Sequence, residues 1–291
     1  MSAAEIALPT RGRIEIEGLG VSYKATMGET EALSDFSMVV EPGEFVSVIG
    51  PSGCGKSTLL NAVAGFVEPT RGSIKVDGQP VRGPSAERGV VFQQYSLFPW
   101  RTVRRNVEFG LKMRGMGKIA REKAARTLLS LAGLLDFENH YPDQLSGGMK
   151  QRVGIVRALA PSPQVLLLDE PFGALDAQTR TVMQQILTNM WQKLRISVIF
   201  ITHDIDEAIF LSDRIYVMTA RPGLLKAELD VPLPRPRVPD MVTSKEFLDL
   251  RVRLIGLIRE ESLKAMGGEL NEAALRGFGI DIGPQGLGSI V

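Results

Sequence analysis

Short apolar stretches recur along this chain and are separated by segments with helical spacing. Ile14–Gly18 and Ala32–Val40 alternate apolar and polar residues, which is typical of half-buried strands. Phe45–Ile49 is apolar at almost every position and predicts a buried strand. Further short strands are predicted at Ser73–Val76, Gly89–Phe92, Val165–Leu168, Val198–Ile201 and Ile215–Met218.

Helical patterns separate these strands, at Thr58–Val67, Gly147–Ala160 and Thr179–Leu194. Strands that alternate with helices favour a mainly parallel sheet with helices on both faces. We therefore predict an α/β fold. Between Pro99 and about Glu138 the spacing of apolar residues becomes purely helical, which predicts a helical insertion into that fold.

The segment after Arg221 has a different character. Its run VPLPRPRVPD is rich in proline, so we expect it to be extended and unable to pair as a central strand. Ser244–Lys264 then predicts an amphipathic helix. The apolar side predicted for this helix consists of Phe247, Leu248, Val252, Ile255 and Ile258. From Met266 onward the chain is rich in glycine, and we expect a flexible tail.

Composition narrows the class of protein. A chain of 291 residues has room for one large α/β domain with an insertion, or for two small domains. The formal charge of +1 argues against a dedicated nucleic-acid binder. Cys54 is the single cysteine, so an intramolecular disulfide is impossible. No secretory signal is expected in Met1–Arg13, and the apolar runs are far shorter than the ~20 residues of a membrane-spanning helix.

A glycine-rich segment follows the predicted strand Phe45–Ile49 and precedes a helix. Its sequence GPSGCGKS fits the pattern G-x-x-x-x-G-K-[ST], in which backbone N–H groups surround a phosphate at the helix N-terminus. Lys56 would supply a positive charge for the β- and γ-phosphates, and the Ser57 hydroxyl would bind Mg²⁺. The predicted ATP-binding residues here are Gly50, Pro51, Ser52, Gly53, Cys54, Gly55, Lys56, Ser57 and Thr58.

Cys54 in this loop allows two interpretations. It can be a small residue that the loop tolerates, which is the simpler interpretation. Alternatively, its thiol could have a lowered pKa because it lies near the N-terminus of a helix.

Two adjacent acids end the buried strand Val165–Leu168. The carboxyl ends of strands in an open α/β sheet are the edge where ligands bind. Asp169 is therefore a candidate for holding Mg²⁺, through water, and Glu170 is a candidate general base that polarises an attacking water. At this point kinases, GTPases, AAA+ machines and ABC ATPases all remain possible.

The segment Leu145–Arg152 (LSGGMKQR) separates these classes. Ser146 is a natural helix cap, and Gly147 and Gly148 leave N–H groups accessible at the helix start. This segment resembles the signature sequence of ABC ATPases, and the order of the other motifs agrees with that family. The resemblance implies that Ser146, Gly147 and Gly148 contact the ATP held by a second subunit.

The resemblance extends over about residues 14–220 and implies further roles. Gln93 matches the glutamine that contacts Mg²⁺ and the attacking water, and His203 matches the histidine that contacts the γ-phosphate. Asp176 matches an aspartate that crosses the dimer interface, and Tyr23 resembles the aromatic residue that stacks on adenine. Met149 departs from the family, in which many members have Gln at this position; the phosphate-binding backbone is unaffected, so we expect activity to be retained.

The family resemblance also implies an architecture. It is a P-loop NTPase (RecA-like) core with a mainly parallel sheet, an antiparallel β subdomain and an inserted helical subdomain. We expect the ABC ATPase domain at residues 11–240, with the helical subdomain at about 96–160. Residues 241–291 would form a C-terminal helix and a flexible tail.

Transport and soluble roles in DNA repair or translation are the alternatives for such an ATPase. Soluble members carry long coiled coils, zinc modules or tandem copies, for which this chain has no room. A P-loop kinase would need an acceptor site and has no use for Leu145–Gly148. The insertion begins with Phe98 and Trp100, which resemble the groove that holds a permease helix in importers, although both could be core residues.

The insertion also carries an excess of positive charge, with nine Lys/Arg and two Glu between Arg101 and Arg126. This is either a solvated helical face or a surface that meets lipid headgroups or a permease. The motif Ala220–Gly223 and the proline-rich run resemble the nitrate/sulfonate/taurine importer group. The resemblance implies ATP and Mg²⁺ as cofactors.

The partners that the resemblance implies are a second ATPase subunit, two transmembrane permease subunits and an extracytoplasmic substrate-binding protein, with no nucleic acid. We expect the second ATPase subunit to be a copy of this chain, and a heterodimer is the alternative. The chain would then lie peripherally on the cytoplasmic face of a bacterial inner membrane.

Overall fold

The computed structural model of this chain describes residues 11–25, 28–94, 96–173 and 175–265. The glycine-rich segment that we expected to be flexible lies outside the described residues. In the described part of the chain, no helix is long and apolar enough to cross a membrane.

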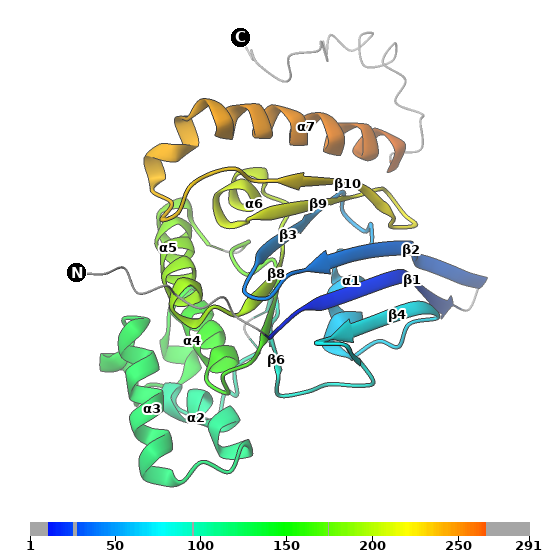
Figure 1. Cartoon of the computed structure of the whole chain (residues 1–291). Coiled ribbons are helices and arrows are strands. Elements are labelled where there is room, and N and C mark those ends of the chain that lie inside the picture. The colour runs from blue at the N-terminus through cyan, green and yellow to red at the C-terminus, as the bar shows by residue number, and fades with distance from the viewer. Residues whose placement is uncertain (1–10, 26–27, 95, 174, 266–291) are drawn as a thin grey trace, which may run out of the picture.

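A six-stranded sheet forms the centre of the molecule, in the order β10-β9-β3-β8-β7-β6 (Figure 1). Neighbours among β9, β3, β8, β7 and β6 are parallel, and β10 pairs antiparallel with β9 at one edge. The strands are β3 (Phe45–Ile49), β6 (Arg88–Val91), β7 (Val165–Asp169), β8 (Ser197–Ile201), β9 (Arg214–Met218) and β10 (Leu225–Asp230). The predicted mainly parallel sheet is confirmed, and β10 is an edge strand that the sequence pattern did not reveal.

Both faces of this sheet are covered by other elements. Side chains alternate along each strand, so successive residues pack against opposite layers. In β7, Val165 and Leu167 face α1 (Lys56–Ala64) and the second sheet, whereas Leu166 and Leu168 face the opposite layer of helices. That layer contains α4 (Gly147–Leu159), α5 (Ala177–Leu194) and α6 (Ile205–Leu211). The continuous apolar run of β7 therefore reflects burial on both sides.

An antiparallel sheet packs on the α1 side, in the order β2-β1-β4-β5. Its strands are β1 (Ile14–Ala25), β2 (Gly28–Val40), β4 (Arg71–Val76) and β5 (Gln79–Pro80). The apolar members of the alternating pattern, such as Ile14 and Ile16, are buried against α1.

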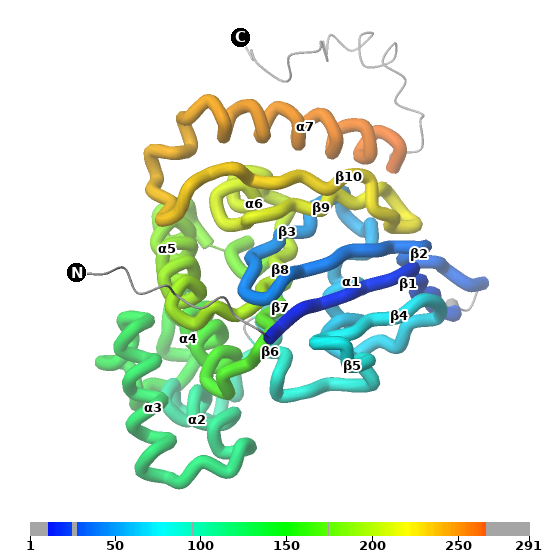
Figure 2. Tube along the Cα trace, in the orientation of Figure 1, coloured from blue at the N-terminus to red at the C-terminus, as the bar shows by residue number. Residues whose placement is uncertain are grey.

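The helical insertion leaves the main sheet after β6 and lies at its lower left in Figure 2. It contains α2 (Val103–Met113), α3 (Lys118–Leu131) and short 3₁₀ turns at Leu135–Phe137 and Pro142–Gln144, and it returns through α4. Asn106 is fully buried and fixes the loop that precedes α2. Its side chain accepts a hydrogen bond from the Phe98 N–H at 2.9 Å and donates to the Arg101 carbonyl at 3.1 Å.

The last described helix, α7 (Lys245–Ala265), follows a 3₁₀ turn at Pro239–Thr243 and lies alongside β10 and α6 (Figure 1). Its predicted apolar side is wrong in part: Leu248, Val252 and Ile255 are exposed. The buried side carries Phe247 and Leu254, with Ile258 partly buried. Two apolar stripes exist on this helix, and packing against α6 decides which of them is buried.

Candidate functional site

The phosphate loop connects the end of β3 to the start of α1. Gly53 and Gly55 have φ angles of +74° and +106°, a region that side chains with a Cβ rarely adopt. A Cβ at Gly55 would also lie 2.8 Å from the Ala32 carbonyl oxygen. These positions let the backbone curl around the N-terminus of α1, where N–H groups are free to bind an anion.

Lys56 is held inside this curl. Its side chain is 7% exposed, and its Nζ donates hydrogen bonds of 2.8 Å to the carbonyl oxygens of both Gly50 and Pro51. The ammonium group is therefore placed within the loop by its own backbone. This position agrees with the prediction that Lys56 supplies a positive charge to bind the β- and γ-phosphates.

Cys54 is buried beneath the same loop, at 1% exposure. Burial raises the pKa of its thiol, against the opposing effect of Lys56. The reactive-thiol interpretation is therefore wrong, because burial outweighs the positive environment. The simpler interpretation, a small residue that packs in the loop, agrees with this geometry.

Asp169 ends β7 opposite the phosphate loop. The Ser57 hydroxyl donates to its Oδ1 at 3.2 Å. Burial raises the pKa of Asp169, and the bond from Ser57 acts in the opposite direction. A hydroxyl and a carboxylate side by side are oxygen ligands of the kind that Mg²⁺ prefers, and Mg²⁺ sites that also use substrate phosphates need few protein ligands. These residues thus fit the predicted metal.

Glu170 meets two side chains from neighbouring strands. Gln93, just after β6, donates from Nε2 to Glu170 Oε2 at 3.3 Å. His203, just after β8, brings Nδ1 to 3.2 Å from the same oxygen. Glu170 itself has a φ of +44°, and its N–H donates to the Ile201 carbonyl at 2.9 Å. The predicted catalytic residues therefore come together, because β6, β7 and β8 end at the same edge of the sheet.

A single pocket of about 430 Å³ contains this arrangement. The residues that line it are Ser52, Gly53, Gly55, Lys56, Ser57, Thr58, Gln93, Asp169, Glu170, His203 and Arg221. Arg221 also lines the pocket, although it belongs to none of the motifs that predicted the site. The motif Ala220–Gly223 contains Arg221, but nothing in that motif predicts that it lies close to the phosphate loop.

Tyr23 lies beside this pocket on β1. Its hydroxyl is 3.4 Å from Thr58 Oγ1, and its side chain is 42% exposed. An exposed ring next to the phosphate loop is compatible with the predicted stacking on a base.

The signature residues lie away from the pocket. Ser146 caps α4 by accepting a hydrogen bond from the Met149 N–H at 3.3 Å. Asp176 caps α5 by accepting from the Thr179 N–H at 3.0 Å, and this bond lowers the pKa of the Asp176 carboxyl. Gly148 touches the same corner, because a Cβ there would lie 2.6 Å from Thr179 Cγ2. Gly147 begins α4 at this corner. Ser146, Gly147, Gly148 and Asp176 thus lie where the N-terminal ends of α4 and α5 meet, and none of them lines the phosphate pocket of the same chain.

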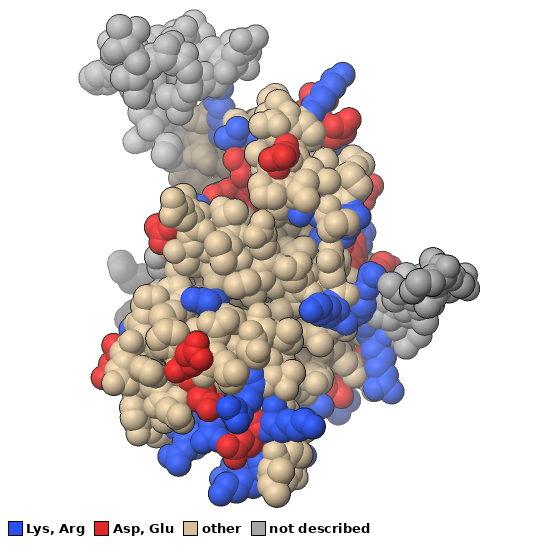
Figure 3. Space-filling model, turned by 90° about the vertical axis from the view of Figure 1, so that its left-hand side faces the viewer, with Lys and Arg blue, Asp and Glu red and all other residues tan. Residues whose placement is uncertain are grey.

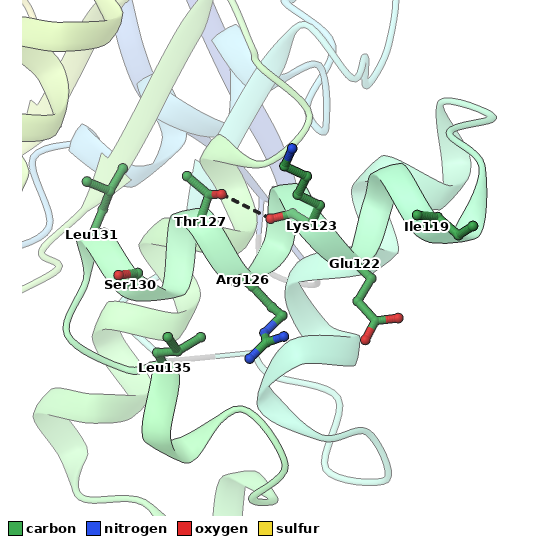
Figure 4. A pocket seen from close by; sticks show the side chains of 8 residues that line it. All are labelled: Ile119, Glu122, Lys123, Arg126, Thr127, Ser130, Leu131 and Leu135. Atoms are coloured by element: carbon green, nitrogen blue, oxygen red, sulfur yellow. Dashed lines mark hydrogen bonds between the residues drawn. The ribbon is translucent and has the colours of Figure 1, made fainter.

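The helical insertion carries a second hollow, of about 590 Å³, along α3 (Figure 4). Apolar residues (Ile119, Leu131 and Leu135) and charged residues (Glu122, Lys123 and Arg126) line it together. It contains no phosphate loop and none of the predicted catalytic residues, so it is not part of the nucleotide site.

The positive excess of the insertion is partly balanced by ion pairs. Arg104 pairs with Glu122, Arg121 pairs with Glu108 at 3.3 Å, and Arg126 pairs with Glu138 at 3.1 Å. Blue and red groups are accordingly interspersed at the lower end of this face (Figure 3). The arrangement agrees with a solvated helical face rather than a purely basic patch.

Comparison with known proteins finds close similarity over most of the chain. A family model described as ABC transporter matches residues 33–173. The chain is 48% identical over 254 residues to an uncharacterized ABC transporter ATP-binding protein of Methanocaldococcus jannaschii, covering 87% of this chain and 94% of that protein. It is 52% identical over 221 residues to the nitrate import ATP-binding protein NrtD of Synechocystis sp., covering 76% of this chain and 83% of that protein.

The taurine import ATP-binding protein TauB of Yersinia pestis is 50% identical over 218 residues, which are 75% of this chain and 84% of that protein. Among solved structures, a dimeric ATP-binding cassette in a post-hydrolysis state with ADP and phosphate matches with a TM-score of 0.69 and 34% identity. That match covers 76% of this chain and 100% of the other. It confirms the predicted fold class.

Proposed function

Because this chain belongs to the ABC transporter family, we propose that it is the ATP-hydrolysing subunit of an importer for a small anion, such as nitrate, a sulfonate or taurine. The observation that carries the proposal is the meeting of Gln93, Glu170 and His203 in a pocket that also contains the phosphate loop. Relatives named for nitrate import and taurine import support the substrate class.

The phosphate loop is the part of the pocket that binds ATP. The N–H groups at the start of α1 and the ammonium group of Lys56 balance the charge of the phosphates. Ser57 and Asp169 would hold Mg²⁺, whose chemistry is to neutralise charge on the β- and γ-phosphate oxygens. Gln93 would complete this side of the site.

Glu170 is the proposed general base. Its carboxylate accepts a hydrogen bond from Gln93, which orients it, and His203 Nδ1 lies 3.2 Å from the same carboxylate oxygen. A base held in this way can take a proton from a water that attacks the γ-phosphate. His203, which is 66% exposed, is free to contact the γ-phosphate directly. Catalysis would rest on positioning and charge, as in other phosphoryl transfers.

Dimerisation completes each site in this proposal. Ser146, Gly147 and Gly148 present the N-terminus of α4, and Asp176 lies beside them. These residues do not line the pocket of their own chain. In a dimer of identical subunits they would contact the ATP held by the partner.

Trp100 supports the coupling to a permease. Its side chain is 70% exposed, and its ring is 5.8 Å from that of Phe98. Phe98 packs on Phe109 at 4.8 Å, and the guanidinium of Arg157 lies over the Phe98 ring. A large aromatic side chain held outward by packed neighbours is typical of a contact surface.

The complex would contain two of these chains, two transmembrane permease subunits and an extracytoplasmic substrate-binding protein, at the cytoplasmic face of the membrane. A role in DNA repair or translation is less well supported. The relatives of this chain that are named for import favour transport, and so does the short insertion built from α2 and α3.

Uptake measurements test this function. Deletion of the gene in its native host should abolish uptake of one labelled anion among nitrate, taurine and an alkyl sulfonate. The wild-type gene should restore it and a Lys56→Ala variant should not. Unchanged uptake of all three anions would overturn the substrate class.

Purification of the tagged chain with a polytopic membrane protein would support the transport role, and a nucleic-acid or ribosomal partner would overturn it.

A further inference from the structure

The turn between β9 and β10 packs directly against the phosphate loop. At Gly223 an added Cβ would lie 2.2 Å from the carbonyl oxygen of Cys54, so only a glycine allows this approach. Gly223 also donates its N–H to the Ala32 carbonyl at 3.0 Å, and its own carbonyl accepts from the Ser34 N–H at 3.1 Å. The turn is therefore fixed to both the phosphate loop and β2.

Thr219 closes the same turn. Its N–H donates to the Leu224 carbonyl at 3.0 Å, and its Oγ1 accepts from the Leu224 N–H at 2.9 Å. The hydroxyl in turn donates toward the Pro222 carbonyl at 3.1 Å. This bonding holds Arg221 at the tip of a short, closed turn.

Arg221 faces the phosphate pocket from this tip. It lines the nucleotide pocket together with Ser52, Gly53 and Lys56. It also lines a neighbouring hollow of about 640 Å³ that extends to the end of α7. Among the residues that the structure describes, its guanidinium makes no hydrogen bond or ion pair. It is thus a positive charge available at the mouth of a site built for a polyanion.

The position of the turn depends on α7. Glu261 is 2% exposed, and its Oε2 accepts the Ala220 N–H at 3.0 Å, one residue before Arg221. Its Oε1 accepts from Lys226 Nζ at 2.8 Å and from Lys264 Nζ at 2.7 Å. Lys226 also donates to the Leu257 carbonyl at 3.3 Å, which attaches β10 to the same helix. A buried carboxylate therefore connects the C-terminal helix to the turn.

We propose that Arg221 is a further phosphate-binding residue of the nucleotide site, and that Glu261 is the positioning residue that holds its turn in place. This inference rests on the proposed function, because it assigns the ligand of Arg221 as the phosphate chain of ATP. A guanidinium donates several N–H groups to phosphate oxygens in a fixed plane, which an ammonium group does not reproduce. The C-terminal helix then contributes to ATP affinity through one hydrogen bond to the backbone.

Equilibrium titration of the full chain with ATP and with ADP tests Arg221, with EDTA present so that hydrolysis does not interfere. Arg221→Met keeps an unbranched apolar stem of similar bulk and removes the guanidinium charge, and it should weaken both affinities about tenfold. Arg221→Lys should recover part of that loss. Arg251→Ala, which removes an exposed arginine of α7 that pairs with Asp206, is the matched control and should bind normally.

A double-mutant cycle tests Glu261. Glu261→Gln should lower ATP affinity in the wild-type background and should cause no further loss in the Arg221→Met background. Its effect on the melting temperature should be the same in both backgrounds. Glu260→Gln changes the neighbouring exposed acid, which also pairs with Lys226, and should leave ATP affinity unchanged.

The outcomes separate this inference from the function on which it rests. Equal ATP affinity for the wild type, Arg221→Met and Arg221→Lys would overturn the role of Arg221 and leave the ATPase intact. Additive losses of affinity for Glu261→Gln and Arg221→Met would overturn the positioning role of Glu261. A wild-type chain that binds neither ATP nor ADP would instead contradict the proposed function itself.

Discussion

His203 Nδ1 lies 3.2 Å from Glu170 Oε2, although the two residues come from different strand ends of the main sheet. The same carboxylate oxygen accepts the Gln93 side chain, and the Glu170 N–H is bonded to the carbonyl of Ile201 in β8. Glu170 is therefore held through both its backbone and its side chain. This is the kind of restraint that a general base needs before substrate arrives.

Replacement of Glu170 by Gln should separate ATP binding from hydrolysis. The amide keeps the size of the side chain but cannot accept a proton from water, so turnover should fall at least about 100-fold while ATP affinity is retained. Phosphate release and equilibrium ATP binding measure the two effects. Glu68→Gln, a change at an exposed acid, is the control. Normal turnover of Glu170→Gln would remove Glu170 from the role of base.

Gly148→Ala should disturb the corner between α4 and α5. The new Cβ would lie 2.6 Å from Thr179 Cγ2, so either the Thr179 side chain or one of the two helices has to shift. Thr179→Ser removes that methyl group and keeps the hydroxyl that bonds Asp176 at 2.7 Å. We expect Gly148→Ala to lower stability by about 1–3 kcal/mol and the double variant to recover most of it. Thermal unfolding of the four proteins measures this, and no recovery would contradict the packing argument.

Asn106→Leu should destabilise the helical insertion. Asn106 is fully buried and bonds the backbone of Phe98, Arg101 and Thr102, so its loss leaves buried polar groups without partners. We expect a loss of about 2–4 kcal/mol in the free energy of unfolding. Urea denaturation measures this loss, with Thr127→Ala on the exposed side of α3 as the control. A change no larger than that of the control would contradict the assigned role.

Trp100→Ala tests the proposed contact with a permease. Its ring is 70% exposed, so truncation should leave folding and ATP binding nearly unchanged. Uptake in cells should fall about tenfold or more if the ring is a central contact. Ile119→Ala, at a site that is 87% exposed on α3, is the control. Full uptake with Trp100→Ala would show that coupling does not use this side chain.

The stability of the C-terminal helix should depend on pH through Glu261. Burial raises the pKa of Glu261, but hydrogen bonds from Lys226, Lys264 and the Ala220 N–H together lower it to about 2, against an ordinary value of 4.5. A pKa lowered by folding gives stability that is present above the ordinary value and is lost as the pH falls toward the folded value. The advantage of the wild type over Glu261→Gln should therefore shrink by up to about 3 kcal/mol below about pH 4.5.

Urea denaturation of both proteins between about pH 3 and pH 7 checks this dependence. Glu260→Gln serves as the control, because its side chain is 65% exposed. An advantage of the wild type that stays constant over this range would contradict the low pKa of Glu261.

Local pattern was sufficient for several elements. The apolar run Val165–Leu168 predicts β7, and GPSGCGKS after Phe45–Ile49 predicts the phosphate loop before α1. In these segments the signal lies in consecutive residues. An unbroken apolar run indicates a strand buried on both faces, and closely spaced glycines indicate a tight backbone turn. Short elements without such a pattern, β10 and α6, were missed.

For the helix α7, the local sequence pattern does not predict which face is buried. Its sequence has two apolar stripes, one with Leu248, Val252 and Ile255 and the other with Phe247 and Leu254, and periodicity does not say which of them is buried. Packing against α6 and β10 buries the second. The burial of Cys54 and the ion pairs of Arg104 and Arg121 likewise depend on segments that are distant in sequence.

Consecutive residues are enough to predict the parts of the nucleotide site: a phosphate loop, two acids at a strand end and a capped glycine pair. These features depend on residues that are neighbours along the chain. The folded chain is needed to see that Gln93 and His203 contact one oxygen of Glu170, that Arg221 lies at the phosphate pocket, and that Glu261 bonds to the turn of Arg221. Those relationships depend on the order of strands in the sheet and on how α7 packs, and hydrophobic periodicity carries no information about either.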